Sequence, residues 1–199
     1  MNIAIIPARG GSKRIKKKNI KNFFRKPILQ YTFEIIKKSK LFSKIILSTD
    51  DLRIARVGKK IGFKIVLKRS KKNSGSKSTT IDAVKECLEQ FNHKNNYNLC
   101  CIYPCSIFIT KHDMTKGLRI LNRNQNYFVY PVQEFPHPIE RAFTLSNNNK
   151  IKYLKKANSN KNTQSFKKKY YDSGQFYWGK IKKWKKGKNL HSEALGFKV

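Results

Sequence analysis

The feature of this sequence that most constrains its fold is an alternation of short apolar runs with helical patterns over the first 70 residues. The apolar runs have the length of buried strands, and the segments between them repeat apolar side chains at helical spacing. Pro27 stands where a helix can begin, and Gly62 where a helix can end. The runs are residues 2–6, 44–48 and 63–67, and the helical patterns are residues 28–36 and 52–61. This order predicts βαβ units and a mostly parallel sheet with both faces covered.

The alternation continues through the middle of the chain. Helical patterns are found at residues 79–91 and 113–121, and strand-like runs at 98–103 and 127–132. The chain has 199 residues, which is the size of one ordinary domain, and it contains no internal repeat. We therefore expect a single α/β domain over residues 1–199.

The net charge of +34 is extreme for a chain of this size. One explanation is a basic protein that binds nucleic acid or a membrane surface, and the other is a lysine-rich solvated surface. A nucleic-acid-binding arm concentrates charge in a run without apolar residues, whereas lysines here are interspersed with Ile, Leu, Phe and Val. This spacing favours the solvated surface and argues against nucleic acid, although such a field still attracts anionic substrates.

The cysteines Cys87, Cys100, Cys101 and Cys105 form no CxxC pair and have no histidine at zinc-finger spacing. Reduced, buried thiols in a cytoplasmic protein are the simplest expectation. No run reaches about 18 apolar residues, so we expect no membrane span. The apolar start of the chain is too short for a signal peptide.

The loop at residues 7–19 carries the clearest chemical signal. It follows the first predicted strand, and the carboxyl ends of parallel strands are where such folds bind ligands. Gly10 and Gly11 allow the backbone to approach a phosphate with its N–H groups turned inward, and Arg9 and Lys13 add positive charge. The spacing matches neither a Walker A loop nor a GxGxxG loop. An ordinary glycine turn is the alternative, but the Arg-Gly-Gly-Ser cluster directly after the strand favours a phosphate loop.

With these motifs in view, the sequence resembles the acylneuraminate cytidylyltransferase family. The segment IIPARGGSKRIKKKNI is similar to the family's signature loop, and the similarity continues through KPILQYTFE and LFSKIILSTDD. Near the end, EFPHPIERA and YYDSGQFYWG resemble most closely the branch that activates pseudaminic acid. The resemblance covers nearly the whole chain in order.

The resemblance implies a Rossmann-like three-layer nucleotide-diphospho-sugar transferase fold with a mostly parallel mixed sheet. It implies that CTP and a nonulosonic acid react to give a CMP-sugar and pyrophosphate. The positions that match nucleotide-binding residues are Ala8, Arg9, Gly11, Ser12, Lys13, Lys18, Asn19 and Arg69, and those that match sugar-facing residues are Tyr103, Gln175, Phe176 and Tyr177. Among them, Arg9 and Lys18 are expected to act in catalysis, because cations stabilise the charge that develops on pyrophosphate.

Some of these residues have a structural alternative. For Arg69 the alternative is a solvated arginine, although the nucleotide contact is favoured, and for Tyr103 it is an aromatic residue at a strand end. Phe176 and Tyr177 are also typical of a core or a dimer contact. For the two aspartates at residues 50–51, the simpler interpretation is that they cap the next helix.

The resemblance also implies Mg²⁺ as cofactor, held in the family by an Asp-x-Asp segment after the last strand. The sequence ends at Val199 without such a segment, so we expect no protein ligands for the metal here. The family implies a homodimer formed through a β-rich insertion, for which residues 128–176 are the candidate. Two alternatives to an active cytidylyltransferase remain open: an inactive truncated paralogue, and a basic protein that binds nucleic acid or a membrane surface and has kept only the fold.

Overall fold

The computed structural model describes residues 1–12 and 14–199. Within these residues the chain divides into two compact units, one of residues 1–131 and 174–197, the other of residues 132–173 and 198–199. The elements of the first unit are β1 (Asn2–Pro7), α1 (Ile28–Ser39), β4 (Lys44–Thr49), α2 (Leu52–Ile61), β5 (Ile65–Lys68), α3 (Thr80–Leu88), β6 (Asn98–Ile102), α4 (Lys111–Arg123), the start of β7 (Phe128–Glu134), β11 (Phe176–Lys180), α5 (Ile181–Lys186) and most of β12 (Ala194–Lys198). Two short strands, β2 (Asn22–Phe23) and β3 (Lys26–Pro27), form a hairpin before α1.

The first unit is built on one mixed sheet with the strand order β7-β11-β6-β1-β4-β5. The neighbours β6, β1, β4 and β5 are parallel, whereas β11 runs antiparallel to β6 and to β7, and β12 pairs with β7. The path from β1 through α1 to β4 and through α2 to β5 is the pair of βαβ units that the alternation predicts. The expected α/β fold with a mostly parallel mixed sheet is therefore confirmed.

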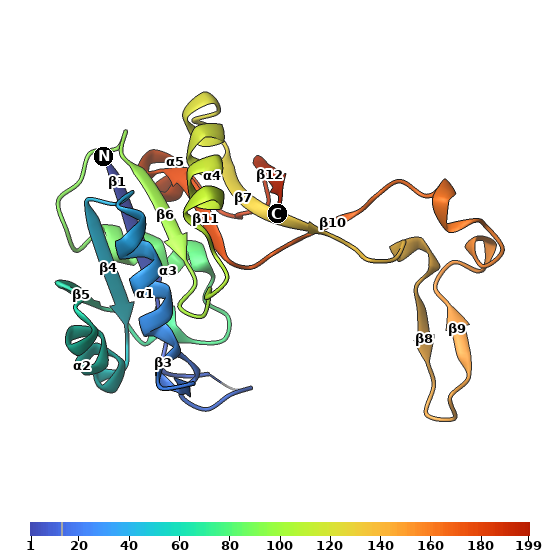
Figure 1. Cartoon of the computed structure of the whole chain (residues 1–199), viewed down its shortest axis with the longest axis horizontal. Helices are drawn as coiled ribbons and strands as arrows, with labels where there is room; N and C mark the ends of the chain where they lie inside the picture. The colour runs from blue at the N-terminus through green and yellow to red at the C-terminus, as the bar shows by residue number, and fades with distance from the viewer. Residues whose placement is uncertain (13) are drawn as a thin grey trace. The chain divides into compact units, whose positions relative to one another are not determined.

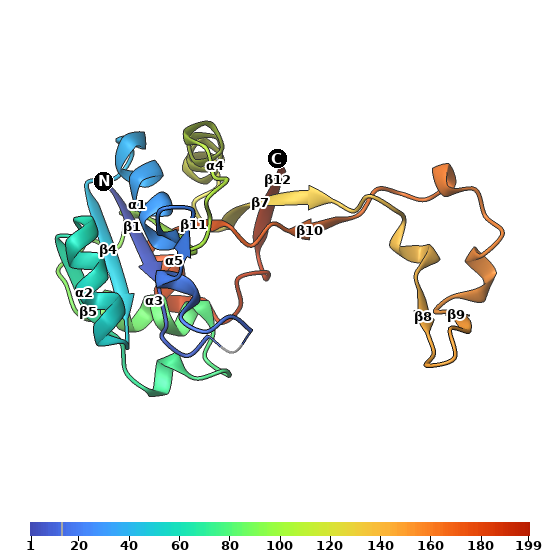
Figure 2. The same ribbon diagram turned by 60° about the horizontal axis from the view of Figure 1, so that its bottom comes forward.

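Helices cover both faces of this sheet, which makes three layers (Figures 1 and 2). Because successive strand side chains point to opposite faces, Ala4 and Ile6 of β1 pack with α1, α2 and α4, while Ile3 and Ile5 pack with α3 and α5. All four side chains are fully buried. An apolar run that is buried on both faces is what a central parallel strand requires.

Side-chain caps fix where the helices begin and end. Asp51 caps the start of α2, and Thr79 and Asp82 form a reciprocal capping box at the start of α3. Gly62 ends α2 with a φ of 112°, in the left-handed region that glycine adopts without strain. The sequence predicts the start of α1 after Pro27 and the end of α2 at Gly62, and the structure has both.

The sequence analysis did not predict α5 and β12. Helix α5 is short and rich in lysine, and its buried side chains are Ile181 and Trp184, which stand one helical turn apart. Two apolar positions do not make a recognisable period. The indole N–H of Trp184 donates to the Leu99 carbonyl at 3.4 Å, so this large side chain helps to fix the helix to the sheet.

The second unit contains a small hairpin and the end of β7. Strands β8 (Phe143–Leu145) and β9 (Ile151–Tyr153) pair antiparallel on either side of residues 146–150. Strand β10 (Tyr170–Asp172) pairs with residues 132–134 of β7. Residues 132–173 of this unit fall within the segment 128–176 singled out from the sequence. Its use in dimerisation stays a prediction.

Candidate nucleotide site at the carboxyl edge of the sheet

Four loops meet at the carboxyl edge of the parallel strands, because neighbouring parallel strands end side by side. In the register of the sheet, Pro7 of β1 lies opposite Ser48 of β4, and Thr49 lies opposite Lys68 of β5. Two backbone bonds extend the ladder past the strand ends: Ala8 N–H donates to the Ser48 carbonyl at 2.8 Å, and Arg69 N–H donates to the Thr49 carbonyl at 2.9 Å. The loops after β1, β4, β5 and β6 therefore begin side by side at the same edge of the sheet.

A hydrogen bond to Asp50 holds the glycine loop after β1. The Gly10 N–H donates to the Asp50 carboxylate at 2.9 Å. A Cβ at Gly10 would lie 2.7 Å from both the Cβ and a carboxylate oxygen of Asp51, so only glycine fits without a shift. A Cβ at Gly11 would meet nothing within 4 Å, so the backbone there faces open space. The loop is thus fixed at Gly10 and accessible at Gly11, as a phosphate-binding loop requires.

Asn19 closes the same loop from its far end. Its amide donates to the Arg9 carbonyl at 2.9 Å and accepts from the Cys105 thiol at 3.6 Å, and its side chain is buried. The sequence predicts a nucleotide contact for Asn19. The structure instead engages its side chain inside the loop, which makes it a support for Arg9 in this conformation.

The other loop residues named from the sequence are distributed as follows. Ala8 has its methyl group in the core and its N–H on Ser48, so neither group is available to a ligand and the residue anchors the loop. Ser12 and Lys18 are half-buried, and Lys18 begins the 3-10 helix η1 (Lys18–Ile20). Lys13 lies outside the described residues.

Arg69 is the most unusual residue of this edge, because two nitrogens of its buried guanidinium have no hydrogen-bond partner among the described residues. The residue is 5% exposed, and its Nε and Nη2 atoms have no hydrogen-bond partner among the described residues. Its Nη2 lies 4.0 Å from an Asp50 carboxylate oxygen. Burial lowers the pKa of Arg69, while the charges of Asp50 and Glu86 oppose that change.

Burial decides between the two interpretations of Arg69 given above. The solvated-arginine alternative is wrong, since almost none of the side chain touches water. A buried cation with unused N–H groups costs free energy, and such groups in a cleft are typical of a binding site that awaits an acceptor. The charge of Arg9 also lowers the pKa of Arg69.

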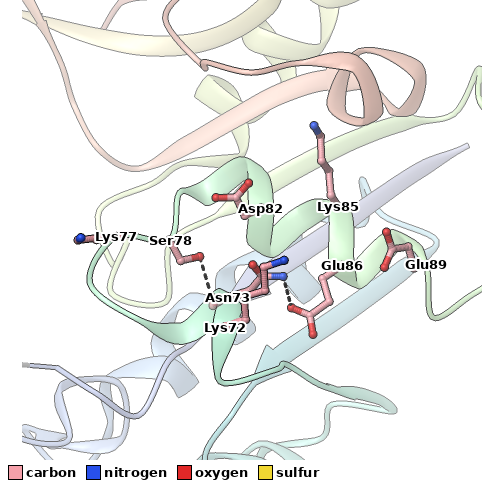
Figure 3. A pocket seen from close by; sticks show the side chains of 8 residues that line it. All are labelled: Lys72, Asn73, Lys77, Ser78, Asp82, Lys85, Glu86 and Glu89. Atoms are coloured by element: carbon pink, nitrogen blue, oxygen red, sulfur yellow. Dashed lines mark hydrogen bonds between the residues drawn. The ribbon is translucent and has the colours of Figure 1, made fainter.

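The loop after β5, residues 70–78, lies between Arg9 and helix α3. The Arg9 Nη1 donates to the Gly75 carbonyl at 3.0 Å, and the Asn73 amide donates to the Glu86 carboxylate at 2.7 Å. Between this loop and α3 lies an open depression of about 420 Å³. Figure 3 shows the side chains that line it: Lys72, Asn73, Lys77, Ser78, Asp82, Lys85, Glu86 and Glu89.

Tyr103 follows β6 and reaches towards α3. Its hydroxyl is 2.7 Å from the Thr80 hydroxyl, its N–H donates to the Gln175 carbonyl at 2.9 Å, and its ring packs edge-on against Tyr177. Gln175 is half-buried, and its carbonyl also accepts from the Ser106 hydroxyl at 2.9 Å. Tyr103 and Gln175 are therefore joined at the start of one edge loop.

Phe176 and Tyr177 lie in the core. Phe176 is 0% exposed and Tyr177 is 2% exposed, and they pack in the clusters on opposite faces of the sheet. Side chains so placed present no surface to a sugar in this conformation. The core alternative left open by the sequence therefore fits these two residues better than the predicted sugar contact.

The two aspartates after β4 bind different parts of the chain. Asp51 accepts from the backbone N–H groups of Arg53 at 2.7 Å and Ile54 at 3.4 Å, so the capping interpretation is confirmed for this residue. The hydrogen bond from the Arg53 side chain lowers the pKa of Asp51. Asp50 does not cap the helix but faces the glycine loop and Arg69.

Sequence reasoning missed Glu86, which holds the loop after β5. A glutamate next to Lys85 and close to Glu89 forms no motif that would mark it in the sequence as a functional residue. Its partner loop could have been found only from the sheet order, which brings α3 against the end of β5.

Within residues 1–12 and 14–199, no three side chains of the types His, Cys, Asp or Glu gather in a way that could hold a metal ion. In the same part of the chain, none of the helices combines the length and the apolar character needed to cross a bilayer.

Residues 3–182 match the family model described as "Cytidylyltransferase". Pseudaminic acid cytidylyltransferase from Campylobacter jejuni subsp. jejuni serotype O:23/36 (strain 81-176) is 36% identical over 185 residues, which are 92% of this chain and 80% of that protein. The Helicobacter pylori (strain ATCC 700392 / 26695) protein described as "Pseudaminic acid cytidylyltransferase and UDP-2,4-diacetamido-2,4,6-trideoxy-beta-L-altropyranose hydrolase" is 33% identical over 192 residues, 96% of this chain and 37% of that protein.

The fold also matches a solved structure of CMP:2-keto-3-deoxy-manno-octonic acid synthetase complexed with CTP. The TM-score is 0.72 and the sequence identity 14%, and the match covers 100% of this chain and 89% of that one. At this level of identity the similarity supports the fold alone. It agrees with the three-layer transferase fold that the sequence motifs imply.

Proposed function

Because the chain belongs to the cytidylyltransferase family, we propose that it transfers a cytidylyl group from CTP to a nonulosonic acid. Pseudaminic acid is the first candidate, since that sugar is named for relatives at 36% and 33% identity over most of the chain. The products are then the CMP-sugar and pyrophosphate.

The observation that carries this proposal is the convergence of the glycine loop with the buried Arg69 at one sheet edge. The loop offers an accessible backbone at Gly11 and the charges of Arg9 and Lys18, which suit a triphosphate. The Nε and Nη2 groups of Arg69 have no partner among the described residues, and a guanidinium recognises planar oxygen acceptors such as those of a base or a phosphate. We assign the triphosphate to the loop, including Ser12 and Lys13, and the cytidine side to Arg69.

The chemistry that follows needs no covalent step on the protein. The anomeric hydroxyl of the sugar attacks the α-phosphorus of CTP, the new oxygen–phosphorus bond forms, and the bond between the α- and β-phosphates breaks. Pyrophosphate leaves with the electron pair, and the hydroxyl proton passes to water. The contribution of Arg9 and Lys18 is electrostatic, because they stand where negative charge grows on the leaving group.

Mg²⁺ belongs to this proposal as a companion of the nucleotide. Within the described residues no cluster of carboxylates suits the ion: Asp51 is engaged with Arg53 and the start of α2, and Asp50 with Gly10. The residues that the structure describes therefore do not fit a protein-held magnesium, and we derive no step through one. Mg²⁺ commonly keeps several waters and binds through substrate phosphates, which is the arrangement we propose here.

For the sugar, we propose Tyr103 and Gln175 as the contact residues, because they line the loop after β6 at the same edge. We also propose that the second unit forms the contact of a homodimer. Large apolar side chains are exposed on it, and an isolated two-stranded hairpin is marginally stable in water. These side chains are Phe135, Ile139, Phe143, Leu145, Ile151, Leu154, Tyr170 and Tyr171.

The experiment that tests the proposal is pyrophosphate release from CTP and Mg²⁺ with each of three sugars: pseudaminic acid, legionaminic acid and N-acetylneuraminic acid. We expect release with pseudaminic acid, and much less with ATP, GTP or UTP in place of CTP. Release with another sugar alone would move the substrate within the class. No release with any sugar, and no thermal shift with CTP, would contradict the proposed function.

A further inference from the structure

Glu86 of α3 holds the loop that begins directly after Arg69. Its carboxylate accepts from the Ser70 N–H at 2.6 Å, the Ser70 hydroxyl at 3.2 Å and the Asn73 amide at 2.7 Å. Figure 3 shows the Glu86 side chain turned towards Asn73 at the wall of the depression. One carboxylate thus binds both ends of the first turn of this loop.

The same segment is held at two further points. Before it, the Gln90 amide donates to the Lys68 carbonyl at 2.9 Å. After it, the Gly75 carbonyl accepts from Arg9 at 3.0 Å. Residues 70–75 are therefore held between Glu86 of α3 and Arg9 of the glycine loop. Arg69 directly precedes them, and its own N–H donates to the Thr49 carbonyl at the edge of the sheet.

The charge of Glu86 acts on Arg69 without a hydrogen bond to its Nε or Nη2. Burial lowers the pKa of Arg69, and the charges of Asp50 and then Glu86 oppose that change. Neither Nε nor Nη2 of Arg69 donates to a described residue. Glu86 therefore compensates part of the buried charge while it leaves the donors available to a ligand.

We propose that Glu86 is a positioning residue for CTP: by fixing Ser70 and Asn73 it sets the backbone that aims Arg69 at the nucleotide and keeps Gly75 against Arg9. Glu86 itself touches no substrate. This inference rests on the proposed function, because it concerns how the CTP site is held in shape.

Glu89 provides a matched control. It is the C-cap residue of α3, three positions after Glu86, and it lines the same depression, but among the described residues its side chain makes no hydrogen bond or ion pair. Glu86→Gln and Glu89→Gln each remove one negative charge beside this depression, and only the first affects the loop.

The test is the steady-state kinetics of pyrophosphate release for both variants. For Glu86→Gln we expect the KM for CTP to rise about tenfold with kcat changed less than about twofold, since lost pre-organisation weakens binding of the nucleotide. For Glu89→Gln we expect both constants within about twofold of the wild-type protein. A purely structural role would instead lower the melting temperature and the active fraction, and would leave KM unchanged.

A second variant tests the bond without a change in α3. Asn73→Asp places a carboxylate against Glu86 and is expected to raise the KM for CTP at least as much as Glu86→Gln. In the double variant Glu86→Gln with Asn73→Asp, the exchanged amide and carboxylate can pair again. We expect its KM to return most of the way to the wild-type value.

The results distinguish a failure of the positioning role from a failure of the proposed function. A KM for Glu86→Gln equal to that of the wild-type protein, or a double variant no better than Asn73→Asp alone, would overturn the positioning role while the proposed function stands. Absence of both turnover and CTP binding in the wild-type protein would overturn the proposed function, and the inference with it.

Discussion

At the scale of single residues, Arg69 combines a cost in stability with a gain in binding. Its guanidinium is buried, and its Nε and Nη2 lack partners among the described residues. Replacing a buried charge by an apolar side chain of similar length is often neutral or stabilising. A residue that is kept for folding and one that is kept for a ligand therefore respond oppositely to the same substitution.

We expect Arg69→Met to leave the melting temperature unchanged or to raise it by a few degrees, because about 1 kcal/mol shifts it by roughly 2–4 °C in a chain of this size. The stabilisation by saturating CTP should fall, as the affinity drops at least about tenfold. Thermal melts with and without CTP measure both. Lys68→Met, at the exposed neighbouring position, is the control. A large loss of stability with an unchanged CTP effect would show that Arg69 is a structural residue.

Substitutions at the two glycines of the loop should have different effects on stability. A Cβ at Gly10 would press on Asp51 at 2.7 Å, whereas a Cβ at Gly11 meets open space. We expect Gly10→Ala to lower the free energy of unfolding by about 1–3 kcal/mol, the usual cost of overpacking. For Gly11→Ala we expect a change within about 0.5 kcal/mol, as at other open surface positions. Urea denaturation of both variants checks this, and equal losses would contradict the loop geometry.

At the scale of elements, the most predictable parts were those where several signals agree. Strand β1 ends in a glycine loop, and α2 has an aspartate at its start and a glycine at its end, so chemistry and period indicate the same boundaries. Helix α5 was missed because its burial depends on Trp184 reaching the sheet, which is a tertiary contact. Strand β12 follows a turn region, and a glycine and a terminal lysine leave no continuous apolar run in it.

The cap that Asp51 forms at the start of α2 should contribute to stability in a pH-dependent way. The hydrogen bond from Arg53 lowers its pKa, so the charged carboxylate stabilises the folded protein above the unfolded pKa, which is about 3.9, and this contribution is lost as the pH falls through the folded value. We expect Asp51→Ala to cost about 1 kcal/mol at pH 7, as for other helix N-caps.

The difference between Asp51→Ala and the wild-type protein should then shrink as the pH is lowered below about 4. Urea denaturation across this range measures it, with Glu89→Gln as the control for general acid effects. A difference that does not depend on pH would show that the cap works without its charge.

At the scale of the whole molecule, a mostly parallel α/β sheet could be predicted from the sequence, and the site only in part. Parallel strands bring the loops after β1, β4, β5 and β6 to one edge, so the neighbourhood of the glycine loop and Arg69 follows from the fold. The sequence could not predict that Asn19 turns inward, that Arg69 is buried or that Glu86 holds its loop. Each of these depends on side-chain packing between elements far apart in the chain.

The homodimer is a prediction at this same scale. Leu145 and Ile151 lie opposite each other in the β8–β9 hairpin, and they are 61% and 58% exposed. We expect light scattering to give twice the chain mass of 23.3 kDa, and the double variant Leu145→Lys with Ile151→Lys to give the single mass. Leu52→Lys, at an exposed position of the first unit, is the control. A wild-type protein of single mass would contradict the dimer.

The loop of residues 7–19 is proposed above as the CTP triphosphate site of a cytidylyltransferase. Calorimetric titration of CTP with Mg²⁺ into the wild-type protein, Arg9→Ala and Lys18→Ala tests it most directly, with Lys60→Ala on the exposed side of α2 as the control for charge alone. We predict binding to the wild-type protein and the control, and affinities about tenfold or more weaker for the two loop variants, as expected for the loss of a charge-assisted phosphate contact. Equal affinities in all four proteins would contradict the account.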